Sequence, residues 1–194
     1  MMTNNLLKPT LVLIFLGLSF LLSAQYSNLN YQPYLSKSVP ENVLSFLNDN
    51  VRYAKAVSAK YNIPEDFLLC VAGLETGWGS SELSAQANNY FGIKNLLNEG
   101  PSYCVWHSDY VEGKGMVEAY DCFKRYSSPL MSFLDYMEHV YSKACYAEMM
   151  EMINPSFDDW IRIVEDCGYA TDPEYGAKLK QIKQKYYFSV LLPN

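Results

Sequence analysis

The sequence has 194 residues and a formal net charge of −6, with 19% charged and 15% aromatic residues. This acidic balance and the lack of a basic run argue against nucleic acid as a partner. Once an N-terminal apolar segment is set aside, the length suits one domain with one core. The 17 tyrosines and 3 tryptophans supply core side chains and also flat faces of the kind on which sugar rings stack.

Residues 1–24 are typical of a secretory signal peptide. They carry one charge, Lys8, then an apolar run over Leu11–Leu22 and a small residue, Ala24, at the cleavage position. The apolar run is shorter than the ~20 residues that a membrane span needs, and no cysteine follows it to receive a lipid anchor. We therefore expect an exported, periplasmic or extracellular protein without a stable membrane anchor, beginning with a flexible leader over residues 25–38.

Residues 39–190 are predicted to form one mainly α-helical domain with a small β-hairpin lobe. Prolines and serines at favoured helix starts, together with apolar residues at helical spacing, predict helical stretches at about residues 40–60, 64–76, 81–87, 129–153, 156–168 and 172–186. No internal repeat or low-complexity tract interrupts this pattern.

The second of these helices presents an acid where an apolar residue is expected. Leu68, Val71 and Ala72 form an apolar stripe at i, i+3 and i+4, and position i+7 is Glu75. Glycines follow at once and end the helix. Burial and the negative end of the helix dipole both raise the pKa of a carboxyl group placed there, as a general acid requires. The alternative is a structural acid neutralised by a neighbouring cation or N–H group.

Residues 103–123 are predicted to form a β-hairpin that turns at Gly113, because β-prone residues flank a short glycine-bearing loop. The two registers consistent with this turn place Cys104 opposite Cys122 or one position away. Export favours a disulfide between them, and two reduced thiols at a sheet edge are the alternative. Since the sequence has 5 cysteines, at least one is unpaired, and Cys70 on the buried helix is the expected free thiol.

Two segments, ETGWGSSEL at residues 75–83 and NNYFGIK at residues 88–94, resemble the signature of bacterial cell-wall endo-β-N-acetylglucosaminidases. This family includes flagellar-rod muramidases and autolysins and is often titled mannosyl-glycoprotein endo-β-N-acetylglucosaminidase-like. The resemblance extends from about Asn42 to about Tyr187. It implies a lysozyme-like fold in which the hairpin lobe forms one wall of a cleft.

The resemblance also implies roles for individual residues. Glu75 matches the catalytic acid of the family, and Tyr169 matches a loop tyrosine that faces it. Residues expected to contact substrate are Trp78, Asn89, Tyr90, Phe91 and Tyr110. The alternatives are that Tyr90 and Phe91 belong to the core and that Tyr169 caps it.

A second carboxyl group usually assists cleavage of a glycosidic bond, and the resembled family takes it from the hairpin. Asp109, immediately before Tyr110, is the best match, with Glu112 and Glu118 as fallbacks. Aspartate is one methylene shorter than the usual glutamate, which favours activation of a water molecule over direct attack. Assistance by the N-acetyl group of the substrate, positioned by Tyr169, is the other route.

Together these observations predict an exported, monomeric hydrolase that cleaves GlcNAc-β-1,4-MurNAc bonds in peptidoglycan glycan strands without a cofactor. The only histidines, His107 and His139, lie far apart in the sequence, so no metal site is predicted. Two alternatives stay open: a lytic transglycosylase that uses Glu75 alone, and an inactive glycan-binding module.

Overall fold

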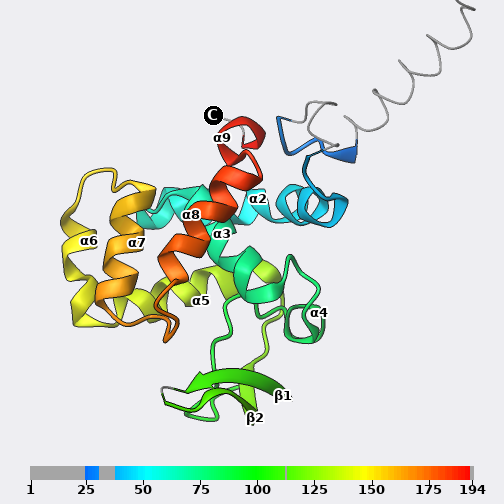
Figure 1. Ribbon diagram of the computed structural model, residues 1–194, viewed down its shortest axis with the longest axis vertical. Helices are drawn as coiled ribbons and strands as arrows, with labels where there is room; N and C mark the ends of the chain where they lie inside the picture. The colour runs from blue at the N-terminus through cyan, green and yellow to red at the C-terminus, as the bar shows by residue number, and fades with distance from the viewer. Residues whose placement is uncertain (1–24, 31–37, 112, 193–194) are drawn as a thin grey trace, which may run out of the picture.

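The computed structural model describes residues 25–30, 38–111 and 113–192. The helices within them are α2 (Glu41–Tyr61), α3 (Glu65–Thr76), α4 (Glu82–Ala87), α5 (Pro129–Tyr141), the 3-10 helix η2 (Ala144–Tyr146), α6 (Ala147–Glu151), α7 (Phe157–Asp166), α8 (Tyr175–Lys185) and α9 (Phe188–Leu191). The strands are β1 (Ser102–Val111) and β2 (Gly115–Lys124). Figure 1 shows the helices gathered into one body, with the hairpin as a lobe beneath them. The predicted mainly α-helical architecture with a small β-lobe is confirmed.

Helix α3 lies at the centre of the helical body, where α2, α7 and α8 pack against it (Figure 1). Five consecutive apolar residues, Phe67 to Val71, are fully buried, because a helix that is apolar on all sides must be covered on all sides. Burial of each large side chain contributes about 1.5–3 kcal/mol. The helix that carries Glu75 is therefore held firmly within the core.

The helix starts follow local sequence signals. The Ser81 side chain accepts a hydrogen bond from the Ser84 N–H, and Ser156 forms a reciprocal capping box with Asp159. The last long helix begins at Tyr175, later than the expected residue 172, because Asp172 Oδ1 instead accepts a hydrogen bond from Glu174 N at 2.9 Å in a turn.

Two stretches differ from the sequence-based expectation. The predicted helical stretch 129–153 is divided into α5, η2 and α6, and the short helix α9 is additional. Residues 25–30, expected in a flexible leader, pack on the body: Tyr26 and Leu29 are buried, and Asn30 N donates to Leu191 O at 2.7 Å. The proposed signal peptide and residues 31–37 lie outside the described part of the chain.

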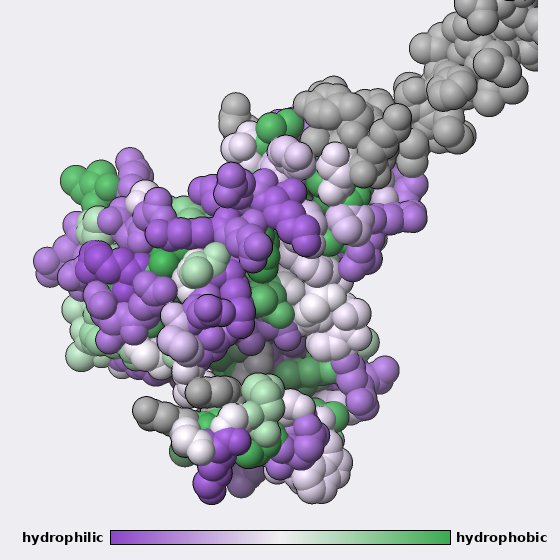
Figure 2. Space-filling view, in the orientation of Figure 1, coloured by the Kyte–Doolittle hydropathy of each residue, from purple (hydrophilic) through white to green (hydrophobic). Residues whose placement is uncertain are grey.

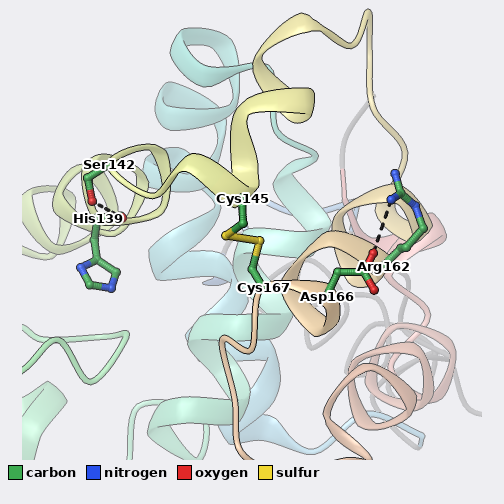
Figure 3. Close-up of a disulfide and its surroundings, with 6 residues drawn as sticks. All are labelled: His139, Ser142, Cys145, Arg162, Asp166 and Cys167. Carbon is green, nitrogen blue, oxygen red and sulfur yellow. Dashed lines mark hydrogen bonds and ion pairs between the residues drawn. A yellow bond between two sulfur atoms is a disulfide. The ribbon is translucent and has the colours of Figure 1, made fainter.

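The hairpin register places Cys104 directly opposite Cys122, and the two form a disulfide. A second disulfide, which the sequence did not suggest, joins Cys145 in η2 to Cys167, the residue that follows α7 (Figure 3). Among the cysteines, Cys70 is free and buried in α3. Within residues 25–30, 38–111 and 113–192, no helix combines the length and apolarity that crossing a bilayer requires.

Candidate active site

Two adjoining hollows separate the helical body from the hairpin, and together they form the cleft. The smaller hollow has a volume of about 400 Å³ and the larger about 730 Å³. Both are lined by Glu75, Gly92, Lys94 and Asp109. The space-filling view shows the hairpin as a lobe set apart from the body by an indentation (Figure 2). Glu75 and Asp109 thus lie where the two hollows meet.

Glu75 stands in the last turn of α3 and is exposed to the cleft, unlike most of its helix. Its Oε1 accepts a hydrogen bond from the Tyr175 hydroxyl of α8 at 2.9 Å. The surrounding protein desolvates the carboxylate and raises the pKa of Glu75, and the Tyr175 hydrogen bond partly opposes this rise. Because Tyr175 occupies Oε1, the proton of the neutral acid belongs on Oε2.

An unusual turn fixes the end of α3. Gly77, Trp78 and Gly79 all have positive φ angles, of 55°, 61° and 78°. Such a conformation is costly for tryptophan. Thr76 stabilises the turn, since its hydroxyl donates to Ala72 O at 2.6 Å and accepts from Gly79 N at 2.8 Å. The turn holds the last helical residues, and with them Glu75, in one position.

Trp78 packs against the aromatic core and is not among the residues that line either hollow. Its ring meets Phe46 edge-on at 5.6 Å and Tyr186 at 5.1 Å between centroids. A Cβ atom on Gly73 would come within 2.5 Å of the indole, so the indole fills the space over that glycine. The tryptophan of the motif therefore supports the turn after Glu75 from behind, and its contact with substrate stays a prediction.

The segment 88–94 is organised by the buried side chain of Asn89. Its amide nitrogen donates to Ile93 O at 3.0 Å and to Lys124 O at 2.9 Å, and its oxygen accepts from Ile93 N at 3.1 Å. These bonds tie the segment to the end of β2, which Lys94 also meets through a bridge to Phe123. Gly92 adopts φ 64° and forms the cleft floor between Glu75 and the hairpin.

The other predicted substrate contacts are divided between the cleft and the core. Asn89 borders the smaller hollow and Phe91 the larger one, although both are almost fully buried. Tyr90 packs between Phe46 and Phe133, at centroid distances of 6.1 and 5.8 Å, and its contact with substrate stays a prediction. The side chain of Tyr110 lies outside the described part of the structure.

Tyr169 lines the larger hollow together with Glu75 and Tyr175. Its ring contacts those of Tyr136 and Tyr175, each at 5.7 Å between centroids. Burial, followed by the nearby Tyr136 and Glu75, raises the pKa of Tyr169 well above its ordinary value. The disulfide at Cys167 anchors the start of this loop two residues away (Figure 3).

Asp109 faces the cleft from β1 beside a charged network. Lys94 Nζ lies 3.3 Å from Asp109 Oδ2 and 2.7 Å from Asp121 Oδ2, and His107 Nε2 lies 2.8 Å from the same Asp121 oxygen. The hydrogen bonds from Lys94 and His107 lower the pKa of Asp121. The bond to Asp121, supported by the one to Asp109, raises the pKa of Lys94. Lys94 therefore holds a positive charge next to Asp109.

The fallback acids differ from Asp109 in position. Side chains alternate between the two faces of a strand, so Glu118 lies on the face opposite Asp109. There it accepts a hydrogen bond from the Ser108 hydroxyl, its partner across the hairpin. Glu112 lies outside the described residues. Of the acids predicted on the hairpin and described, Asp109 is the one that shares the cleft with Glu75 and Tyr169.

Sequence reasoning missed Tyr175, Lys94 and Asp121 as members of the site. Tyr175 was expected only to face inward from the last helix. Strand alternation puts His107, Asp109 and Asp121 on one face once the register is known, and the Cys104–Cys122 pair would have supplied that register. The described residues hold no group of three His, Cys, Asp or Glu side chains arranged to bind a metal ion.

Known proteins are similar to this chain over most of its length. The family model Glucosaminidase, described as mannosyl-glycoprotein endo-beta-N-acetylglucosaminidase, matches residues 51–188. The exo-glucosaminidase LytG of Bacillus subtilis is 30% identical over 146 residues, covering 73% of this chain and 50% of LytG. The peptidoglycan hydrolase FlgJ of Vibrio parahaemolyticus is 30% identical over 151 residues, covering 73% of this chain and 46% of FlgJ. The chain thus spans about half the length of these curated relatives.

Solved structures share the fold. The catalytic domain of the autolysin Auto from Listeria monocytogenes superposes with a TM-score of 0.64 at 28% identity, covering 77% of this chain and 87% of that domain. A glycoside hydrolase domain of FlgJ from Salmonella typhimurium gives a TM-score of 0.59 at 27% identity, with coverage of 73% and 95%. The predicted lysozyme-like domain is confirmed.

Proposed function

We propose, because this chain belongs to the mannosyl-glycoprotein endo-beta-N-acetylglucosaminidase family, that it is a peptidoglycan hydrolase cleaving GlcNAc-β-1,4-MurNAc bonds with Glu75 as general acid. The observation that carries the proposal is the place of Glu75, at the junction of two hollows and opposite Asp109. A polysaccharide lying through both hollows has one of its glycosidic bonds at this junction.

In the proposed reaction Glu75 gives its Oε2 proton to the glycosidic oxygen as the bond to the anomeric carbon breaks. The raised pKa of Glu75 supports this role, since the acid must hold a proton at the working pH. Tyr175 fixes the carboxyl group through Oε1 and leaves the other oxygen for the substrate. The MurNAc fragment then departs with a neutral hydroxyl group.

Asp109 is proposed to take part from the other side of the bond. Its carboxylate stabilises the positive charge that develops at the anomeric carbon and accepts a proton from the attacking water. Lys94, held by both Asp109 and Asp121, positions this carboxylate. In the substrate-assisted route, Tyr169 orients the N-acetyl group instead, and its place on the larger hollow beside Glu75 supports that role.

Export is part of the proposal and rests on residues 1–24. The apolar run with its small residue at Ala24 directs the chain out of the cytoplasm. Peptidoglycan lies outside the cytoplasm, so export brings the enzyme to its substrate. Disulfide formation favours an oxidising compartment, and the two cysteine pairs of the fold support it. We propose that the exported domain acts as a monomer.

Mass spectrometry of the fragments released from purified peptidoglycan tests the proposed bond. Cleavage after GlcNAc leaves GlcNAc at the reducing end of the fragments, and this is the expected product. Reducing-end MurNAc would identify a muramidase, and an anhydro-sugar a lytic transglycosylase. The absence of any released fragment from a folded protein that still binds peptidoglycan would identify an inactive glycan-binding module.

A further inference from the structure

Two aromatic side chains stand exposed on the face of the hairpin that does not carry Asp109. This side of the hairpin, which we call the outer face, is formed by the cross-strand pairs Cys104–Cys122, Trp106–Tyr120 and Ser108–Glu118. Trp106 is 67% exposed and Tyr120 is 57% exposed, and their ring centroids lie 5.4 Å apart. Large exposed aromatic rings at adjacent positions are unusual, because burial of each would stabilise the fold.

The neighbouring pairs on the outer face hold the two rings in place. On one side the Cys104–Cys122 disulfide links the strands covalently. On the other side the Ser108 hydroxyl donates to the Glu118 carboxylate. An isolated two-stranded hairpin is only marginally stable, so a covalent link beside the aromatic pair gives the rings a rigid base. A rigid surface loses less conformational entropy when a ligand binds.

The aromatic pair is continuous with the cleft. Trp106 is also one of the residues that line the smaller hollow, together with Glu75 and Asp109. Tyr120 lies directly across the hairpin from Trp106, one step further from the cleft. A chain that leaves the smaller hollow along Trp106 therefore meets Tyr120 next.

We propose that Trp106 and Tyr120 bind the part of the peptidoglycan glycan strand that extends beyond the cleft. This inference rests on the proposed function, since it assigns a further binding site to the same substrate. Sugar rings present apolar C–H faces that pack on aromatic planes, and the Ser108 and Glu118 oxygens beside the rings accept hydrogen bonds from sugar hydroxyl groups. The two rings are tilted by 52° to one another, so each offers its own face to a sugar.

The size of the patch favours a glycan over a protein partner or a second copy of the chain. Full burial of a tryptophan or tyrosine removes about 150–250 Å² from water. Since Trp106 and Tyr120 are 67% and 57% exposed, the two together supply roughly 200–300 Å². A stable protein interface needs about 600 Å² or more from each partner. A narrow polysaccharide, by contrast, needs no wider surface than two adjacent rings.

The test measures binding to purified, insoluble peptidoglycan sacculi by co-sedimentation, with Glu75→Gln as the parent so that no substrate is consumed. Adding Trp106→Ala and Tyr120→Ala is expected to weaken binding about tenfold or more. Adding Trp106→Phe and Tyr120→Phe keeps both ring faces and is expected to retain most of the affinity. Circular dichroism and thermal unfolding establish that each variant is folded.

A matched control removes exposed apolar side chains elsewhere. Met150 lies in α6 and Ile153 just beyond its end, and they are 50% and 90% exposed. Met150→Ala with Ile153→Ala in the same parent is expected to leave binding unchanged. Equal binding by the alanine variant and its parent would overturn the inference while leaving the hydrolase proposal intact. The inference would also be overturned if analytical sedimentation showed that the Glu75→Gln parent forms a dimer and the alanine variant does not. If the wild-type protein releases no fragments and the parent does not bind sacculi, the proposed function and this inference both fail.

Discussion

The hydrogen bond from Tyr175 to Glu75 can be removed with little change in shape by Tyr175→Phe. This bond stabilises the ionised form of Glu75 and so opposes the rise of its pKa. A hydrogen bond to a charged group contributes about 1.5–3 kcal/mol. Since Glu75 is exposed to the cleft and water screens it, we take the lower end. That is roughly a tenfold change in the ratio of protonated to ionised Glu75.

The sign of the effect follows from the role of Glu75. A general acid must be protonated, so the rate falls as the pH rises through the pKa of Glu75. Without the Tyr175 hydroxyl this pKa is higher, and the alkaline limb of the rate profile moves to higher pH. At a fixed pH on that limb, the variant is expected to keep up to roughly tenfold more of its maximal rate than the wild type.

The assay is the loss of turbidity of a peptidoglycan suspension, measured across a range of pH. Tyr141→Phe is the matched control, because the Tyr141 hydroxyl also makes one hydrogen bond, to Tyr61 O at 2.6 Å, but away from the cleft. It is expected to cost about 0.5–1.5 kcal/mol of stability and to leave the pH profile unmoved. An unchanged profile in Tyr175→Phe, or an alkaline limb displaced to lower pH, would refute the assignment of Glu75 as an acid tuned by Tyr175.

Three further predictions follow from the site and its supports. Asp109→Asn is expected to lower the hydrolysis rate by roughly 10²-fold or more, whereas Glu118→Gln on the outer face is expected to have little effect. Replacing Cys145 and Cys167 by serine opens a disulfide with a sequence separation of 22, and the free energy of unfolding in denaturant is expected to fall by about 2–4 kcal/mol. Gly73→Ala places a methyl group within 2.5 Å of the Trp78 ring and is expected to cost about 1–3 kcal/mol in thermal unfolding.

Each of these has an outcome that contradicts it. If Asp109→Asn kept the wild-type hydrolysis rate while Glu118→Gln lost it, the hairpin would supply its acid from the outer face. An unfolding free energy unaffected by loss of the second disulfide would mean that Cys145 and Cys167 are not joined in the purified protein. A fully stable Gly73→Ala would mean that the indole does not lie over that glycine.

Sequence reasoning located Glu75, on which the proposed function rests, because local rules govern its place. Glu75 interrupts an apolar stripe at helical spacing, and the glycines behind it end the helix, so both features are readable within a dozen residues. Periodicity placed Glu75 on the buried side, however, whereas the carboxyl group reaches the cleft. The helix packs on all sides, and in such a helix no stripe distinguishes the core from the cleft.

The contacts that the sequence could not predict are those between distant segments. Trp78 was expected at the substrate because it stands inside the motif, but its ring packs on Phe46 and Tyr186, over 30 residues before it and over 100 after it. Tyr175 lies 100 residues from Glu75. Packing between elements so far apart in the chain leaves no local pattern in the sequence, and only the folded structure brings such residues together.

The central claim is that Glu75 supplies the proton that breaks the glycosidic bond. The most direct measurement compares wild type and Glu75→Gln on purified sacculi, by mass spectrometry of the released fragments and by co-sedimentation of the protein. Glutamine keeps the shape of the side chain but cannot deliver the proton. We predict fragments with reducing-end GlcNAc from the wild type, and release slowed by about 10²–10⁴-fold in a variant that stays folded and still binds sacculi. Release by Glu75→Gln at the wild-type rate would contradict the account.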